Sequence, residues 1–320
     1  MKGSSMVKKL IQIGESIHGS IPKPQAAMKE LLKKGPGALE VPSEELDFII
    51  SLINDQREHK ADYIEINVDA FGEDDPQVAV DMMRDYVRLV KKHSQGVPVC
   101  VDSSSDDVLK AGLEEWYNDP APPTALPLLN SVKTYTIDEI LPLRQKYPFK
   151  VIGLLIGDED SGMGDVEFLF SMARGIFQAA AGKYGFQADD VFFDTTVFPL
   201  AIDMPMSPGQ SGYTYRAFET IRRIMNDPDM KGVHTSLGIS NCVKDLPGRK
   251  IGVCRAYLAL AQQYGLDAAI VNVMHDYGSK AAPPELLELI EAFALQDGAP
   301  EASQRAMELM GNFCRTARGK

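Results

Sequence analysis

The segment KVIGLLIG (residues 150–157) is an almost unbroken apolar run that ends in a glycine. A strand exposed on one face alternates apolar and polar residues, whereas a parallel strand buried on both faces shows a continuous apolar run. Similar short runs recur along the whole chain. The strands that we expect are IQIGE (11–15), DYIEINV (62–68), VPVCVDS (97–103), ALPLLNS (125–131), KVIGLLIG (150–157), DVFFDTT (190–196), GVHTSLGIS (232–240) and DAAIVNV (267–273).

The segments between these runs carry apolar residues at the helical spacing i, i+3, i+4 and i+7. One such stripe follows Ser43, and another follows Asp75 and Pro76, which we expect to be an N-cap and the first helical residue. Eight strands that alternate with helices predict a single (β/α)8 barrel. An open doubly wound sheet is the competitor, but neither GxGxxG nor GxxxxGK[ST] occurs. We expect a flexible N-terminus over 1–10, the barrel over 11–282, and extra helices over 283–320 that pack on the barrel.

The composition argues against several classes of function. The chain has 320 residues, with 33 Lys and Arg against 45 Asp and Glu, so its net charge is −12. An acidic surface disfavours nucleic acid and anionic membranes. No apolar run approaches the roughly 20 residues that span a bilayer, and the N-terminal segment has no signal-peptide core. The 4 cysteines form no CxxC pair, so we expect incidental thiols in a cytoplasmic protein.

Polar side chains follow seven of the predicted strands, and in a barrel such positions meet at the C-terminal mouth. These residues are Glu15, Asn67, Asp69, Asp102, Asn130, Asp194, Ser240, Asn241 and Asn272. An Asp or Asn after a strand also often caps the next helix. Seven such ends together are hard to assign wholly to capping, and Ser105 is a better cap than Asp102 for the helix that follows it.

The chemistry of this set favours a flat heterocycle with N–H donors and carbonyl acceptors, such as a pterin or a purine, because carboxylates accept hydrogen bonds and amides do both. No basic residue follows the strands, which argues against phosphate recognition in this pocket. Glu15, Asp102 and Asp194 would hold Mg²⁺ instead if they lay within a few ångströms of one another.

The ordered motifs of the chain resemble the methyltetrahydrofolate:corrinoid methyltransferases, which are part of the pterin-binding, dihydropteroate-synthase-like barrel group. That family includes the methylcorrinoid:tetrahydrofolate methyltransferases of demethylation systems. Each motif alone is weak, but the ordered set covers residues 11–276. The matching segments are IGESIHG (13–19), DYIEINV (62–68), VCVDSS (99–104), LLNSVK (128–133), FFDTTVFP (192–199), LGISN (237–241) and GLDAAIVN (265–272).

The resemblance implies a role for each matching residue. Asp102, Asn130 and Asp194 would hydrogen-bond the pterin ring of tetrahydrofolate or 5-methyltetrahydrofolate. Asn67 would lie at the pterin edge, and we place Glu15 in the same pocket. Asn241 would lie beside N5, the nitrogen that carries the methyl group, in a loop shaped by Gly238 and Ser240.

The chain departs from the family pattern in two places. After Asn241 it continues CVKDLPGR, in which Lys244 and Arg249 would contact the glutamate tail of the folate or a partner, and DMPMSPGQSGY (203–213) is an unusual insert. These departures favour transfer from a methylcorrinoid to tetrahydrofolate over the reverse. No DxHxxG corrinoid motif occurs, so the cobalamin would be supplied by a separate corrinoid protein. We also expect a homodimer and no bound metal.

Three other functions remain open. A dihydropteroate synthase would carry Arg or Lys after strand seven or eight for pyrophosphate, and a DxGxxSTRPG-like second strand, where this chain has INVDAFGED. A non-catalytic subunit would bind folate without methyl transfer. A Mg²⁺-dependent barrel lyase would depend on Glu15, Asp102 and Asp194.

Overall fold

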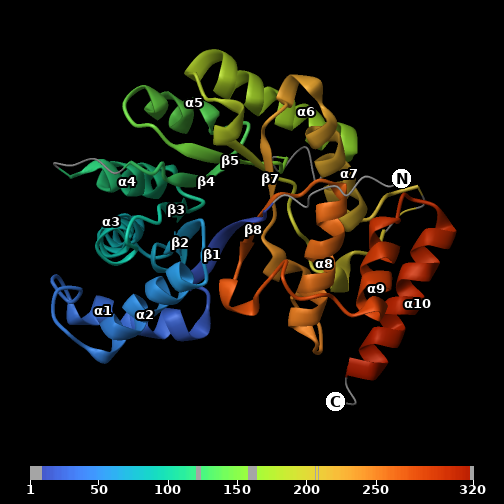
Figure 1. Ribbon diagram of the computed structural model, residues 1–320, viewed down its shortest axis with the longest axis horizontal. Coiled ribbons are helices and arrows are strands. Elements are labelled where there is room, and N and C mark those ends of the chain that lie inside the picture. Colours follow the sequence, from blue (N-terminus) through green and yellow to red (C-terminus); the bar gives the residue numbers. More distant parts are fainter. Residues whose placement is uncertain (1–8, 120–123, 158–163, 206, 208, 318–320) are drawn as a thin grey trace.

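The computed structural model describes residues 9–119, 124–157, 164–205, 207 and 209–317. This part of the chain holds one sheet of eight parallel strands in the order β7-β6-β5-β4-β3-β2-β1-β8 (Figure 1). The strands are β1 (Ile11–His18), β2 (Tyr63–Asn67), β3 (Val99–Asp102), β4 (Leu128–Val132), β5 (Lys150–Leu154), β6 (Val191–Asp194), β7 (His234–Ser236) and β8 (Ala268–Val271).

The two ends of the sheet meet just beyond β7. Gly238 forms a parallel bridge with Ile270 of β8. The backbone N–H of Ile270 donates to the carbonyl of Leu237 at 2.9 Å. The sheet therefore closes, and the expected (β/α)8 barrel is confirmed.

Helices follow the strands and cover the outside of the barrel (Figure 1). The longer ones are α1 (Pro22–Lys34), α2 (Glu44–Glu58), α3 (Pro76–His93), α4 (Asp106–Tyr117), α6 (Val166–Phe177), α7 (Tyr213–Asn226), α8 (Lys250–Tyr264), α9 (Pro284–Ala294) and α10 (Pro300–Ala317). α9 packs against α8, and α10 packs against α9. The division into barrel and C-terminal helices stays a prediction, as does the state of the N-terminus, of which residues 1–8 lie outside the described residues.

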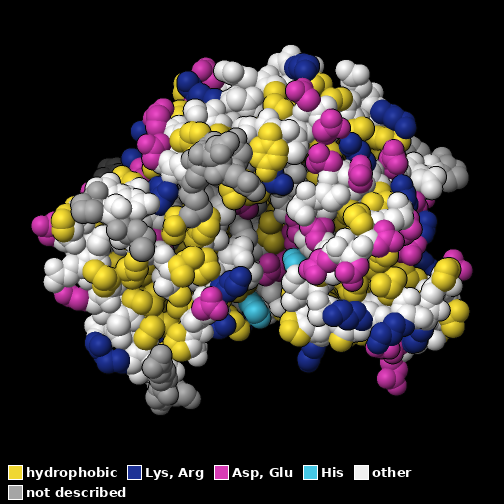
Figure 2. Space-filling model, turned by 180° about the vertical axis from the view of Figure 1, so that it is seen from behind, with side chains coloured by type: hydrophobic (Ala, Val, Ile, Leu, Met, Phe, Trp, Pro, Cys, Tyr) yellow, Lys and Arg dark blue, Asp and Glu magenta, His cyan; other side chains and the backbone are white. Residues whose placement is uncertain are grey.

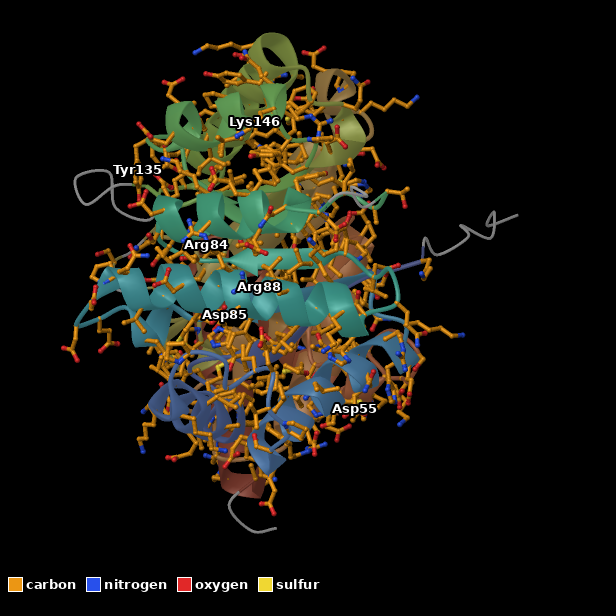
Figure 3. All side chains as sticks on the ribbon, turned by 90° about the vertical axis from the view of Figure 1, so that its left-hand side faces the viewer. Asp55, Arg84, Asp85, Arg88, Tyr135 and Lys146 are labelled. Carbon is orange, nitrogen blue, oxygen red and sulfur yellow. The ribbon has the colours of Figure 1, made fainter. Side chains whose placement is uncertain are left out.

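The expected helix starts are partly correct. Ser43 accepts a hydrogen bond from the backbone N–H of Leu46 at 3.3 Å, and Asp75 accepts one from Gln77 at 3.0 Å. Ser105 occupies the N-cap position of α4 but makes no capping hydrogen bond with its side chain. On the outer surface, α3 carries Arg84, Asp85 and Arg88, and Arg88 pairs with Asp85 (Figure 3).

Apolar side chains close the lower half of the barrel. Successive side chains of a strand point to opposite faces, so every second residue faces the barrel interior. The buried cluster that faces inward, which we call the apolar plug, consists of Ile13, Tyr63, Cys100, Leu128, Ile152, Phe192, Ala268 and Ile270. Because the plug fills the lower half of the barrel, we look for a ligand site above it, at the C-terminal mouth.

Candidate functional site

The next inward-facing residues above the apolar plug are mostly polar. They come two positions after plug residues on β1, β2, β3, β4 and β6. We call this set the polar layer: Glu15, Glu65, Asp102, Asn130 and Asp194. Four of the five are carboxylates, and none is basic. The face in Figure 2 has a hollow near its middle, with acidic and histidine side chains inside it.

Asp102 lies at the centre of the mouth, at the end of β3. Its register partners on the two neighbouring strands are Asn67 and Asn130. The side-chain amide of Asn67 donates to Asp102 Oδ2 at 2.7 Å. The amide of Asn130 makes no hydrogen bond in the described part of the chain. Asn67 therefore fixes the orientation of the Asp102 carboxylate, while the Asn130 amide stays available to a ligand.

Asp69 braces a loop instead of facing a ligand. Its carboxylate accepts hydrogen bonds from the hydroxyl groups of Ser103 and Ser104 and from the backbone N–H of Ser104. Asn272 likewise caps a short turn, because its side-chain oxygen accepts a hydrogen bond from the backbone N–H of Met274 at 3.0 Å. For these two residues, structural roles explain the polar side chain.

The carboxylates of the polar layer are costly to ionise. Burial raises the pKa of Asp194 to about 7, although the backbone N–H of Thr196, 2.7 Å from Oδ1, lowers it. Burial also raises the pKa of Asp102 to about 7, with Asn67 lowering it and Asp69 raising it. The pKa of Glu15 rises to about 7 through burial, partly offset by Ser240. A ligand that donates hydrogen bonds would stabilise the charged forms.

Glu65 is the site residue that the sequence reasoning missed. It lies on β2, two residues before Asn67, and only 2% of its surface is exposed. Burial raises its pKa well above the ordinary value, and the charges of Asp102, Glu15 and Asp194 raise it further. Its Oε2 has no hydrogen-bond partner among the described residues. Such an orphaned buried oxygen points to a ligand or a water molecule above the plug.

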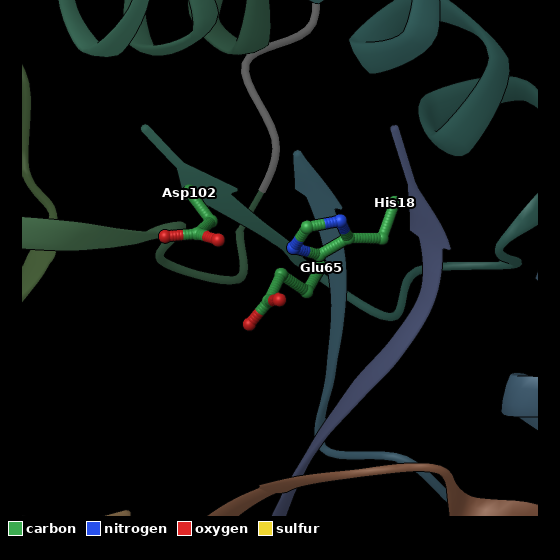
Figure 4. Close-up of side chains that lie close together, drawn as sticks. All are labelled: His18, Glu65 and Asp102. Atoms are coloured by element: carbon green, nitrogen blue, oxygen red, sulfur yellow. The ribbon is translucent and has the colours of Figure 1, made fainter. Parts of the chain in front are cut away.

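A group of possible metal ligands exists, although the sequence led us to expect no bound metal. His18, Glu65 and Asp102 point toward one another from three adjacent strands (Figure 4), with their ligand atoms within 4.8 Å. The lyase alternative named a different set, in which Asp102 joins Glu15 and Asp194. Among the described residues, the group that meets the distance criterion is His18, Glu65 and Asp102.

The loop after β7 forms the 3₁₀ helix η7 (Ile239–Val243). Ser240 Oγ donates to Glu15 Oε2 at 3.3 Å, which ties this loop to β1. Asn241 is exposed, and its side-chain amide makes no hydrogen bond in the described chain. A Cβ built on Gly238 would lie 3.1 Å from Asn241 Nδ2. The small size of Gly238 therefore leaves room for the Asn241 side chain.

The two basic residues expected near this loop lie in different surroundings. Lys244 is exposed and makes no ion pair in the described part of the chain. Arg249 is paired with Glu285, the second residue of α9, at 2.5 Å. Arg249 is therefore engaged by the protein itself.

The chain is similar to several solved structures. Three solved dihydropteroate synthases illustrate the likeness. The protein of Stenotrophomonas maltophilia is 14% identical over 84% of this chain and 88% of its own, with a TM-score of 0.47. The Yersinia pestis protein is 10% identical over 98% and 95%, with a TM-score of 0.48. The Xanthomonas albilineans protein is 17% identical over 79% and 86%, with a TM-score of 0.43. Likeness at this level carries no argument about function.

Among the described residues, no helix is both long and apolar enough to cross a membrane.

The family match is the informative one. The match to the family described as "Pterin binding enzyme" runs over residues 40–272, which is most of the chain and includes most of the polar layer. The chain therefore belongs to the family of pterin-binding enzymes.

Proposed function

We propose that this protein transfers a methyl group from the cobalt of a corrinoid, carried by a separate protein, to N5 of tetrahydrofolate. One observation carries the proposal. The polar layer offers hydrogen-bond acceptors at the bottom of the mouth, while the unbonded amide of Asn241 lies on a loop at its rim. A site with these two parts can hold a heterocycle by one edge and leave a nitrogen of its other ring near a neutral donor.

The polar layer fits the pyrimidine edge of a pterin. That edge carries N–H donors and a carbonyl, so Asp102 and Asp194 would accept from the donors and Asn130 would pair with the remaining groups. Glu65 belongs to the same layer, and its orphaned Oε2 offers one more acceptor. Because buried polar groups without partners are costly, a ligand with several N–H groups gains affinity here.

Asn241 would act on the reacting nitrogen. The lone pair of N5 would form the new bond to the methyl carbon while the Co–C bond of the corrinoid substrate breaks, and the electron pair of that bond would stay on the departing cobalt. An amide held beside N5 orients that lone pair and stabilises the charge that changes in the transition state. Glu15, held to the same loop by Ser240, has a pKa of about 7 and is suited to accept the proton that N5 loses.

An apolar rim around the mouth supports a protein partner. Exposed large apolar side chains lie in the segments that follow the strands on the C-terminal face: Ile21, Tyr135, Ile202, Ile251 and Met274. Tyr135, for example, is 60% exposed beyond β4 (Figure 3). Apolar side chains mark an interaction surface where a partner covers them together, and we propose that role for these five. A corrinoid domain seated on this rim would bring its cobalt above the pocket.

The test is a spectral assay in which tetrahydrofolate demethylates a methylated corrinoid protein. We expect Asn241→Ala to bind tetrahydrofolate within a modest factor of the wild type. Its transfer rate should fall by about 10²–10³, the usual effect of losing one such donor. Asn226→Ala, on the last turn of α7, serves as the matched control and should transfer normally. Wild-type turnover in Asn241→Ala would refute the assigned role.

The same preparation distinguishes the alternatives. Condensation of p-aminobenzoate with a dihydropterin pyrophosphate would identify a dihydropteroate synthase. Folate binding without transfer to or from any methylated corrinoid protein would identify a binding subunit, and activity that depends on Mg²⁺ would favour a lyase. The homodimer and the cytoplasmic location stay predictions, and light scattering after gel filtration tests the first.

A further inference from the structure

Arg216 is a buried cation that forms no ion pair with the described residues. It lies on the first turn of α7, and only 8% of its surface is exposed. Its Nη1 donates to the carbonyl of Gly164 at 2.7 Å, and its Nε donates to that of Gly212 at 3.4 Å. No carboxylate pairs with it in the described part of the chain. Buried charges are normally paired, so this guanidinium has capacity for an anion.

Arg216 borders open space at the C-terminal face of the barrel. It lines a cavity of about 420 Å³ between the start of α6 and the start of α7, together with Gly164, Ser211 and Tyr213. α6 follows β5 and α7 follows β6, so both helix starts lie on the same face as the polar layer. We call this space the α6–α7 cavity.

A second, water-sized cavity of about 20 Å³ lies beside Arg216. Arg216 and Tyr213 line it as well, together with Thr195 and Thr196. These threonines directly follow Asp194 of the polar layer. Their Oγ1 atoms are buried and have no hydrogen-bond partner among the described residues. The orphaned hydroxyl groups are a second, independent sign that a polar ligand belongs beside Arg216.

The neighbouring acids are already engaged. Asp203 is fully buried, and its carboxylate accepts the backbone N–H groups of Tyr213 and Thr214 at the start of α7. Asp165 caps α6 by accepting the backbone N–H of Phe168 at 2.8 Å. The charge of Arg216 lowers the pKa of Asp203, but neither carboxylate forms an ion pair with Arg216. Its guanidinium can therefore still receive the two oxygens of a ligand carboxylate.

Aromatic rings complete the surroundings. Phe198 and Tyr213 lie 4.5 Å apart between ring centroids, and the guanidinium of Arg216 lies 4.7 Å from the centroid of Tyr213. A ligand that has an aromatic ring followed by a carboxylate matches an aromatic surface followed by a buried cation.

We propose that Arg216 and the α6–α7 cavity bind the p-aminobenzoylglutamate tail of the folate, with a glutamate carboxylate on the guanidinium. The inference rests on the proposed function, and it replaces Arg249 as the tail contact, because Arg249 is paired with Glu285. Asp194 would then hold the pterin, and the loop after β6 would direct the tail outward to Arg216.

Calorimetry on the full chain tests this with two ligands. Tetrahydrofolate has the tail, and 6-methyltetrahydropterin lacks it. We expect the wild type to prefer tetrahydrofolate by about 10- to 100-fold, the usual range for charged hydrogen bonds. Arg216→Met should lose that preference and keep its affinity for 6-methyltetrahydropterin within about twofold. Arg223→Met, on the exposed side of the same helix, is the matched control and should keep the preference.

A measurement on the wild type covers the case in which Arg216→Met does not fold. The preference for tetrahydrofolate should fall as NaCl rises, while affinity for 6-methyltetrahydropterin stays nearly constant. Equal affinities of the wild type for both ligands, or equal losses for both in Arg216→Met, overturn this inference alone. So does binding of inorganic phosphate that depends on Arg216 without any preference for the tail. If neither pterin binds, the proposed function fails as well.

Discussion

Replacing Asp194 by asparagine separates the stability of the empty barrel from its affinity for a ligand. Burial raises the pKa of Asp194 from 3.8 to about 7, a difference of about three units. Because the folded-state pKa lies above the unfolded value, this group's stabilisation is complete below pH 3.8. It is lost as the pH rises through 7. At about 1.4 kcal/mol per unit, the ionised carboxylate costs about 4 kcal/mol at pH 8.

An asparagine side chain at this position would have almost the same shape and would keep an oxygen for the backbone N–H of Thr196, but it cannot ionise. We therefore expect Asp194→Asn to raise the free energy of unfolding at pH 8 by up to about 4 kcal/mol. The linkage relation reduces this gain to about 2 kcal/mol at pH 5 and to nearly nothing at pH 3.8. Affinity for tetrahydrofolate should fall at least tenfold, because an acceptor of the pterin N–H groups is lost.

The assay is urea denaturation followed by circular dichroism at pH 8 and pH 5 without ligand, with calorimetry for the affinity. Asp74→Asn, at an exposed position before α3, is the control and should change neither quantity. If Asp194→Asn is no more stable than the wild type at pH 8, or if the difference is the same at both pH values, the argument from burial is wrong.

Two further changes test other parts of the molecule. Gly238→Ala places a Cβ 3.1 Å from Asn241 Nδ2 at an ordinary backbone φ of −77°. It should slow methyl transfer by about tenfold, as expected for a small displacement of a positioned group, without weakening folate binding; unchanged kcat would contradict this. At the lower end of the barrel, His234 contacts Asp267 at 2.9 Å and Asp189 at 3.1 Å; burial lowers its pKa, but these two carboxylates raise it above 6.5 overall. The stabilisation from charged His234 is present below pH 6.5 and is lost above the folded-state pKa. In urea denaturation, His234→Asn should therefore lower the free energy of unfolding by about 1–2 kcal/mol at pH 6 and by less at pH 9. An equal loss at both pH values would count against the charged form.

The fold was predictable from the sequence because burial on both faces leaves a strong signal. Eight apolar runs became eight strands, and the order of elements required the barrel. The strand ends were less predictable. A register irregularity between Gly14 and Ile17 lets β1 continue to His18, so Glu15 lies within the strand and not at its end. Such a bulge depends on the neighbouring strand, which sequence periodicity does not report.

The candidate site was predictable in position where a strand ends in a polar residue, as for Asp102, Asn130 and Asp194, while the roles of these residues stay predictions. Glu65 was missed because it lies inside an apolar run whose polar end is Asn67. Counting back two positions from Asn67 would have placed Glu65 on the inner face. Arg216, which borders the proposed tail site, could not be singled out because a charged residue on an amphipathic helix normally faces water, whereas this one is 8% exposed.

The weak closure between β7 and β8 has a consequence for local unfolding. β7 has three residues, and among the described residues the single backbone bridge to β8 joins Ile270 to Gly238, which lies just beyond β7. Segments held by few backbone hydrogen bonds open at low free energy and exchange their amide hydrogens early. The amide of Ile270 should therefore exchange sooner than the amides of the central strand β3. The loop that carries Asn241 starts at this point. A bound folate would therefore slow the exchange of this amide and stabilise the closed barrel.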